Sequence, residues 1–513
     1  MRGLTRVLLV LILVTAAGRG VLADEPDAAA LAAQIDGHIE SRLHREGQRP
    51  AEPADDAELL RRVYLDLHGV VPTREQAERF LADSGPDKRG RLIDALLASP
   101  RYGEYLADVW QAYLISPLAD DRQVRGDRFR QWLAGQFNTR SWDRVAAELL
   151  TATGKMEENP AVIYLIEGRL PRNVPDLTDL ASRYFLGIRL QCAQCHDHPT
   201  VEWTRQDFWG MAAFFAQVQT PGRAKKVYQV GVVDDPRLDL AALRDAGMID
   251  GFMARPPTFL GGRALSAGEG TSRGALARWM TSPENRYFAR ATVNRTWWRL
   301  FGRGIVQPVD DMHEANPPSH PELLDLLARR FVESGFDHKF LTRAIVLSRA
   351  YQRTSRPGES GEKQAALFGR MSIKVLSAGQ LYDSLETVFG APNKVVGVKG
   401  AQGARAEFTQ FFGEDGDPDP TAYRRGIPHL LRQMNSGQFA GRNLDGLVGR
   451  LEAQGRSAED VASDLFLTIL SRRPTPDERA RFRSHLERCG SERDGCRELA
   501  WALMMSSEFS LNH

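Results

Sequence analysis

The fold is decided by a stretch near the N-terminus that reads Leu59-Leu60-Arg61-Arg62-Val63-Tyr64-Leu65-Asp66-Leu67. Its apolar residues recur at helical spacing, and Gly69 follows where a C-terminal helix cap would lie. Thr73 then begins another helix, because its hydroxyl can accept a hydrogen bond from the amide of Gln76 while the Gln76 side chain returns one. The stretch therefore predicts two helices joined by a short turn that contains a proline-threonine pair.

The same helical hairpin recurs near the C-terminus. Residues 466–482 align without a gap on residues 64–80, and Thr475 with Glu478 forms a second capping box. A serine-containing step follows a later helix in both copies and occurs once more between them, at Ser99, Ser506 and Ser282. We interpret the hairpin as a recurring structural unit, with a period too irregular for a solenoid.

The chain as a whole is predicted to be mainly α, with two helical domains built from such hairpin units. Between them, residues 227–233 are β-branched and strand-like, and residues 256–262 are rich in Pro and Gly. We expect one domain at 24–218, a short strand-containing, Pro/Gly-rich connector at 219–270, and a second domain at 271–513. A loop at 394–420, rich in Gly and Asp, is expected to be exposed and mobile.

The N-terminus has the three parts of a secretory signal. Arg2 and Arg6 precede an apolar run over residues 7–14, and Val21-Leu22-Ala23 offers a signal-peptidase site. The run is shorter than the roughly 20 residues needed to span a bilayer, and no later stretch is a transmembrane candidate. We expect residues 1–23 to be a signal peptide and the mature chain to be exported to the periplasm or the cell surface.

The charge balance argues against nucleic-acid binding. Removing residues 1–23 deletes three arginines and no acid, which leaves 64 basic and 66 acidic residues. Such a chain has no basic excess to bind phosphates. Nucleophile elbows, phosphate loops and HExxH sequences are also missing from the chain, so the sequence gives little support to an enzyme.

The motif that carries chemistry is Cys192-Ala193-Gln194-Cys195-His196, followed by Asp197-His198-Pro199. CxxCH is the attachment signature of c-type haem: two thiols bond to the porphyrin and the adjacent imidazole becomes an axial ligand of the iron. Two other interpretations stay open. Cys192, Cys195 and His198 could be three ligands of a zinc site that still needs a fourth donor. Alternatively, Cys192 and Cys195 could form a disulfide.

Several longer stretches resemble two planctomycete families. Residues 63–73, 98–103 and 192–199 are similar to the second planctomycete surface-cytochrome domain. Four further stretches resemble the companion planctomycete surface domain; they are residues 294–298, 301–304, 318–324 and 348–352. The resemblance covers nearly all of the mature chain and implies a cytochrome-associated surface protein. The fuller family layout has a separate upstream cytochrome module, whereas this chain has one CxxCH.

A haem on His196 would need a sixth ligand from elsewhere. The candidates are Met211 and His198, which are near in sequence, and Met312, His313 and His320 from the second domain. His198 is only two residues from His196 and is poorly placed to reach the opposite haem face. The aromatic residues after the motif either line a haem pocket or form ordinary core; they are Trp203, Phe208, Trp209, Phe214 and Phe215.

Two further groups of polar residues lie outside the CxxCH motif. Asp310 and Asp311 beside His313 and Glu314 could make a carboxylate–imidazole site, although Ser319 and Glu322 favour a capped helix start after this loop. Cys489 and Cys496, close in sequence, are expected to form a local disulfide.

We therefore expect an exported c-type haem-binding protein that transfers electrons to an unidentified redox or cell-surface partner. The alternative is a surface scaffold or partner-binding protein whose CxxCHDH segment is a disulfide or zinc staple.

Overall fold

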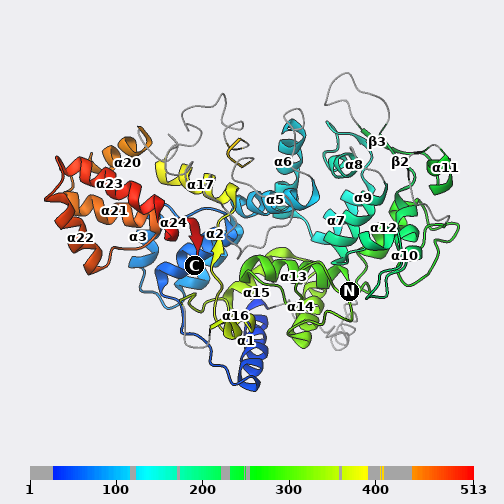
Figure 1. The fold of residues 1–513 in the computed structure, drawn as a ribbon, viewed down its shortest axis with the longest axis horizontal. Coiled ribbons are helices and arrows are strands. Elements are labelled where there is room, and N and C mark those ends of the chain that lie inside the picture. Colours follow the sequence, from blue (N-terminus) through cyan, green and yellow to red (C-terminus); the bar gives the residue numbers. More distant parts are fainter. Residues whose placement is uncertain are drawn as a thin grey trace, which may run out of the picture.

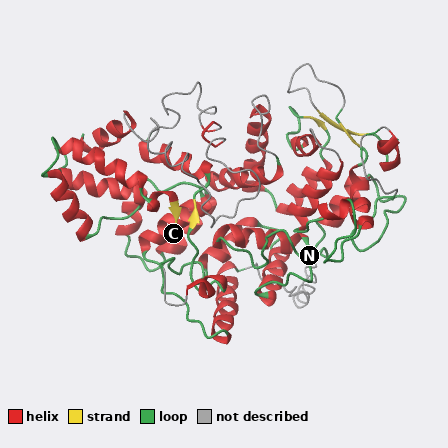
Figure 2. Ribbon diagram, in the orientation of Figure 1, coloured by secondary structure: helices red, strands yellow, loops and turns green. Residues whose placement is uncertain are grey.

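The computed structural model describes residues 27–115, 123–169, 174–220, 231–245, 247, 249, 255–356, 361–390, 405, 407–409, 442–453 and 455–513. The fold is mainly α, as expected, with two small sheets among the helices (Figure 2). The helices of the first half are α1 (Ala28–Arg45), α2 (Asp56–Leu67), α3 (Arg74–Ala82), α4 (Lys88–Ala98), α5 (Pro100–Leu114), α6 (Gln123–Thr139), α7 (Trp142–Thr151), α8 (Val162–Arg169), α9 (Val174–Ala181), the π-helical turn η2 (Ser182–Leu186), the 3₁₀ helix η3 (Gln191–Gln194), α10 (Arg205–Ala212), the 3₁₀ helix η4 (Ala213–Phe215) and α11 (Leu240–Asp245). The second half contains α12 (Ser272–Met280), α13 (Phe288–Phe301), α14 (Pro321–Glu333), α15 (His338–Leu347), α16 (Gly361–Ala366), α17 (Ala378–Phe389), α20 (Arg442–Glu452), α21 (Ala458–Leu470), α22 (Pro476–Leu486), α23 (Glu492–Met505) and α24 (Ser507–Ser510).

The elements spread along one long axis (Figure 1). Helices α20 to α23 lie at one end, and α8 to α12 with the larger sheet lie at the other. Helices α2, α5, α13 and α15 occupy the middle, with α1 packed on α15 below them. The segment that carries CxxCH belongs to the end formed by α8 to α12, because η3 packs on α9 and α10.

The two helical hairpins are confirmed in atomic detail. Thr73 caps α3 with Gln76 as its capping-box partner, and Thr475 caps α22 with Glu478 in the same way. The matching residue just after the preceding helix is left-handed in both copies, with φ of 71° at Gly69 and 62° at Ser471. The copies therefore share their turn geometry although one uses glycine and the other serine.

The larger sheet has three short antiparallel strands in the order β1-β3-β2. They are β1 (Gly154–Lys155), β2 (Val218–Gln219) and β3 (Gly231–Asp234). Only the end of the strand expected at 227–233 is thus seen, because residues 221–230 lie outside the described part of the chain. The turn expected at 256–262 is present, with Gly261 and Gly262 at φ of 95° and 88°. A second sheet pairs β4 (Lys374–Val375) with β5 (Leu511–Asn512).

Two hydrophobic cores divide the molecule, and their boundary is not at the connector. The larger core runs from Ala28 through to Met371 and so joins helices from both expected domains. The smaller core is formed mostly by residues 376–509, but it also takes in Leu65 and Val71 of the N-terminal hairpin. The apolar residues of α2 and of the turn after it are therefore shared between the two cores.

The expected signal peptide at 1–23 lies outside the described residues. Of the loop at 394–420, Arg405 and residues 407–409 are described, and these are anchored. Phe408 is buried against Tyr382, and Arg405 pairs with Asp108 and Asp383. Among the described residues, no helix combines the length and the apolar character needed to cross a membrane.

Candidate functional site

The CxxCH segment begins directly after a sharp change of chain direction. Helix α9 ends in η2, and Gly187 then adopts a left-handed φ of 68°. A Cβ at Gly187 would lie 3.2 Å from both Ala291 Cβ and Met312 Sδ, so α13 and the loop around Met312 pack closely here. The turn leads the chain into η3, which carries the first cysteine.

The two thiols are presented together at the surface. Cys192 lies in η3 and Cys195 is the residue that ends it. Residues three apart in a 3₁₀ helix are separated by one full turn, so their side chains project from the same side. Both cysteines are exposed and free, so the interpretation of this pair as a disulfide does not match the structure. Two accessible thiols on one face are what covalent attachment of a porphyrin requires.

His196 is oriented by its own loop. Its Nδ1 lies 2.8 Å from the carbonyl oxygen of Asp197. Because a carbonyl oxygen only accepts, Nδ1 is the donor, and the lone pair of the neutral ring is on Nε2. An imidazole held in this way is ready to bind a metal through Nε2. The side chain is exposed, as ligand binding from outside demands.

His198 has a different environment. Its Nδ1 accepts a hydrogen bond from the Thr200 amide at 3.3 Å, and its backbone N–H donates to the Trp203 carbonyl. Within the described residues, the ligand atoms of Cys192, Cys195 and His198 do not all lie within 4.8 Å of one another. The zinc alternative would therefore require this loop to rearrange.

The aromatic residues after the motif form core beneath it. Phe208, Trp209, Phe214 and Phe215 are fully buried, and Trp203 is nearly so. Trp209 Nε1 donates to the carbonyl of Gln194 at 3.1 Å, which fixes η3 on α10. These side chains hold the segment in place from below, so a haem attached to the cysteines would lie on the outer surface of this core.

A buried aspartate from the loop before α14 fixes the residues that precede the CxxCH motif. Asp310 is fully buried and pairs with Arg183 in η2 and with Arg189 just before η3, the latter at 2.6 Å. Burial by itself raises the pKa of Asp310, but the charge and hydrogen bond of Arg183, together with Arg295 and Arg189, outweigh it and hold the pKa below the usual range. The carboxylate is thus ionised and saturated by arginines, which leaves it unsuited to acid–base work.

The two arginines contact Asp310 beside the motif, and the sequence alone did not point to them. Arg183 and Arg189 give no local signal, because their partner is more than a hundred residues away in the chain. The loop that carries Asp310 is held here by a second contact as well, since the Met312 amide donates to the Gly187 carbonyl at 2.9 Å. Of the rest of the proposed carboxylate–imidazole cluster, His313 Nε2 lies within ion-pair distance of Asp311 Oδ2, at 3.6 Å, whereas Glu314 is exposed.

The sixth-ligand candidates are in unequal positions. Met211 is fully buried in α10, and His320 is buried against the ring of Phe368 with its Nδ1 on the Ser319 hydroxyl. Burial lowers the pKa of His320 to about 4. Met312 and His313 instead belong to the loop that contacts Gly187.

The capping box expected at Ser319 and Glu322 is wrong. His320 precedes the first residue of α14 and Pro321 occupies its first turn, with no side-chain cap. The Ser319 hydroxyl donates to the carbonyl of Ile305, 14 residues earlier, and is therefore not available to the helix. A tertiary contact has replaced the local one.

The expected Cys489–Cys496 disulfide is also wrong, because both cysteines are free. Cys496 lies on the buried face of α23 and its Sγ is 3.9 Å from the carbonyl oxygen of Ala458. Cys489 instead faces His485 and Glu498. Residues 496 and 498 lie about 200° apart around a helix, so the face of α23 that meets Cys489 at Glu498 is not the face that carries Cys496.

Comparison with known proteins places the chain in a family. Residues 34–220 match the PSCyt2 family, described as a protein of unknown function (DUF1549). Residues 272–442 match the PSD1 family, described as a protein of unknown function (DUF1553). No curated protein and no solved structure matches the chain. The chain therefore belongs to the planctomycete proteins in which a PSCyt2 domain, named for a cytochrome, is followed by a PSD1 surface domain.

Proposed function

We propose that this protein carries a covalently attached c-type haem on Cys192 and Cys195, with His196 as an axial ligand of the iron, and that it transfers electrons. The observation that carries the proposal is the pair of exposed, unbonded thiols on one turn of η3, next to an imidazole whose Nε2 is left for a metal. Haem would supply the one-electron chemistry, and the chain would supply its attachment and orientation.

The chain's contribution is a rigid platform. Trp209 holds η3 on α10, and the ion pairs of Asp310 fix the residues before the motif. Within the motif's continuation, the Asp197 side chain accepts a hydrogen bond from the Arg205 amide at 2.8 Å. These contacts hold the two exposed thiols and His196 on the outer side of the buried aromatic residues. Such a surface leaves a haem edge accessible, which electron exchange with another protein requires.

A sixth ligand from the protein is best supplied by His313, which is half-buried in the loop that is hydrogen-bonded to Gly187. Met211, Met312 and His320 are all packed inside the core. The proposal includes export to the periplasm or cell surface, since haem is attached to CxxCH outside the cytoplasm and the N-terminus has the pattern of a signal peptide.

The filled aromatic core favours a second candidate. Because Phe208, Trp209 and their neighbours leave no open apolar slot below the motif, the segment could instead serve a surface scaffold as a metal staple. In that function His198 becomes a ligand and His196 does not.

Haem staining separates the two. Protein expressed in a host with cytochrome c maturation should show peroxidase activity on a denaturing gel, and Cys192→Ala with Cys195→Ala should abolish it. Cys496→Ala is the matched control, because it removes a cysteine from another part of the chain and should leave the stain intact. A colourless, unstained wild type that retains zinc, and loses it in His198→Ala, would overturn the haem proposal in favour of the staple.

A further inference from the structure

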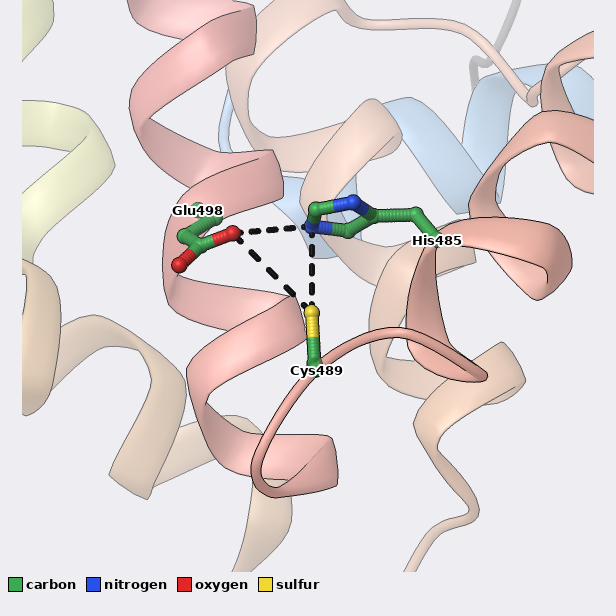
Figure 3. A group of neighbouring side chains, drawn as sticks. All are labelled: His485, Cys489 and Glu498. Carbon is green, nitrogen blue, oxygen red and sulfur yellow. Dashed lines mark hydrogen bonds and ion pairs between the residues drawn. The ribbon is translucent and has the colours of Figure 1, made fainter.

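Three donor atoms of different chemistry meet between α22 and α23 (Figure 3). His485 Nε2 lies 2.9 Å from Glu498 Oε2, Cys489 Sγ lies 3.3 Å from His485 Nε2, and the same sulfur lies 3.9 Å from Glu498 Oε2. In the described part of the chain this is the one group of three such residues whose ligand atoms come this close. All three side chains point toward one centre in Figure 3.

We propose that His485, Cys489 and Glu498 form a zinc site. Zinc binds thiolate, imidazole and carboxylate at bond lengths of about 2.0–2.3 Å in tetrahedral geometry, which places neighbouring ligand atoms about 3.3–3.7 Å apart. Of the three separations in the structure, the one at 2.9 Å is shorter than that range, the one at 3.3 Å lies at its lower end and the one at 3.9 Å is longer. All three are within a few tenths of an ångström of the range. An ion entering between the atoms would need only small side-chain movements.

The local fold explains why the three residues converge. His485 lies in the last turn of α22, and Cys489 follows in the turn after it, where its amide donates to the Leu486 carbonyl. Gly495 allows α23 to approach, because a Cβ there would lie 2.5 Å from Leu486 Cδ2 and 3.5 Å from Cys489 Sγ. Glu498 is about one turn further along α23 and therefore faces the same gap.

The site is open to solvent on one side. The side chains of His485 and Glu498 are 36% and 55% exposed, and Cys489 is partly exposed. Zinc can therefore enter from outside and keep a water as its fourth ligand, as in zinc sites with three protein ligands. Thiolate and imidazole together select zinc over magnesium or calcium, which prefer oxygen ligands.

The competing explanation is an exposed His485–Glu498 ion pair with a thiol beside it. An ion pair of this kind needs no sulfur and contributes little to stability. Cys489 is consequently the residue that distinguishes the two explanations. Replacing it with serine keeps a hydrogen-bonding group in place and removes the soft ligand.

The test uses Co²⁺ as a spectroscopic substitute for zinc, added to the full chain carrying Cys192→Ala and Cys195→Ala. These two substitutions remove the CxxCH thiols, so the result is independent of the haem proposal. We expect a near-ultraviolet thiolate-to-cobalt charge-transfer band with the visible bands of tetrahedral cobalt, both lost on addition of one equivalent of zinc. Cys489→Ser should abolish the charge-transfer band, and His485→Ala or Glu498→Gln should weaken cobalt binding at least tenfold.

Matched controls exist for the thiol and for the imidazole. Cys496→Ser removes the other cysteine of this region, and His44→Ala removes an exposed histidine of α1; both should keep the full spectrum. Circular dichroism of the metal-free variants verifies that they fold. A cobalt spectrum without a thiolate band, a band that persists in Cys489→Ser, or a Cys489–Cys496 disulfide found by peptide mapping of native protein would overturn the proposal.

Discussion

His196 owes its orientation to a single hydrogen bond, from Nδ1 to the Asp197 carbonyl at 2.8 Å. The motif predicted that this residue is an axial ligand, but spacing alone says nothing about which ring nitrogen is free. The structure supplies that detail. It also shows why His198 is the less suitable imidazole, because its Nδ1 accepts from the Thr200 amide and the proton of the neutral ring is then on Nε2.

Replacing His196 should change the iron without releasing the haem. In His196→Ala the thioether bonds to Cys192 and Cys195 remain, so the denaturing gel should still stain, while the absorption spectrum should lose the features of axial imidazole ligation. His198→Ala is the control and should leave the spectrum unchanged. If His198→Ala altered the spectrum and His196→Ala did not, the assignment of the ligand would be wrong.

His338 makes stability depend on pH. The ring is buried edge-on to Trp142 at 5.2 Å, and burial, with a further contribution from Arg299, lowers its pKa to about 3. The unfolded chain, with a histidine pKa near 6.5, binds more protons between these values. The contribution of His338 is therefore fully present above about pH 6.5 and is lost as the pH falls.

Urea unfolding at several pH values measures this effect. The free energy of unfolding should be steady from pH 8 to pH 7 and decline toward pH 5, with His338 contributing up to about 1.4 kcal/mol per pH unit in the acid range. His338→Phe should flatten the decline by that amount. An unchanged slope in this variant would show that His338 does not titrate as the structure implies.

At the scale of helices and turns, local signals predicted local structure well. The capping boxes at Thr73 and Thr475 are confirmed, because each depends on partners within three residues. The box at Ser319 is not formed because the hydroxyl donates to the Ile305 carbonyl instead. The Cys489–Cys496 disulfide is not formed because Cys496 lies on the buried face of α23, whereas Cys489, in the turn before that helix, faces His485 and Glu498. Sequence spacing specifies neither a competing tertiary partner nor the face of a helix that becomes buried.

The paired turns of the two hairpins allow a reciprocal test. Ser471 is left-handed and its buried hydroxyl lacks a hydrogen-bond partner, so Ser471→Gly should be neutral or stabilise the protein by up to about 1 kcal/mol. Gly69→Ser should destabilise it by about 1–3 kcal/mol, because a Cβ there would lie 2.4 Å from Tyr105 Cδ2. Thermal unfolding of both variants checks the prediction. A stabilising Gly69→Ser would show that Tyr105 does not exclude a Cβ at this position.

At the scale of the whole molecule, a buried polar network joins distant parts of the chain. Lys374 Nζ contacts both carboxylate oxygens of Asp66 at 2.7 Å, and the same carboxylate accepts from Tyr351 and from Asn512. These partners lie about 300 or more residues from Asp66 in sequence, so no pattern in the chain predicted them. Helices also pack across residues 219–270, α7 on α12 and η2 on α13, so the expected boundary does not separate the hydrophobic cores.

Breaking one side of this network should be costly. Lys374→Met leaves the buried Asp66 carboxylate without its counter-charge and should lower the free energy of unfolding by about 3–5 kcal/mol. The double variant Asp66→Asn with Lys374→Met removes both charges and should recover part of the loss. Urea unfolding of the single and double variants measures the coupling; strictly additive effects would show that the pair does not act as a unit.

The intact mass of the purified protein shows whether an exported chain carries haem on the two thiols of η3. Protein secreted by a host with cytochrome c maturation should have the mass of residues 24–513 plus one haem, and the Cys192→Ala, Cys195→Ala variant should have the mass of its polypeptide alone. A wild-type mass without haem from that host would contradict haem attachment at η3.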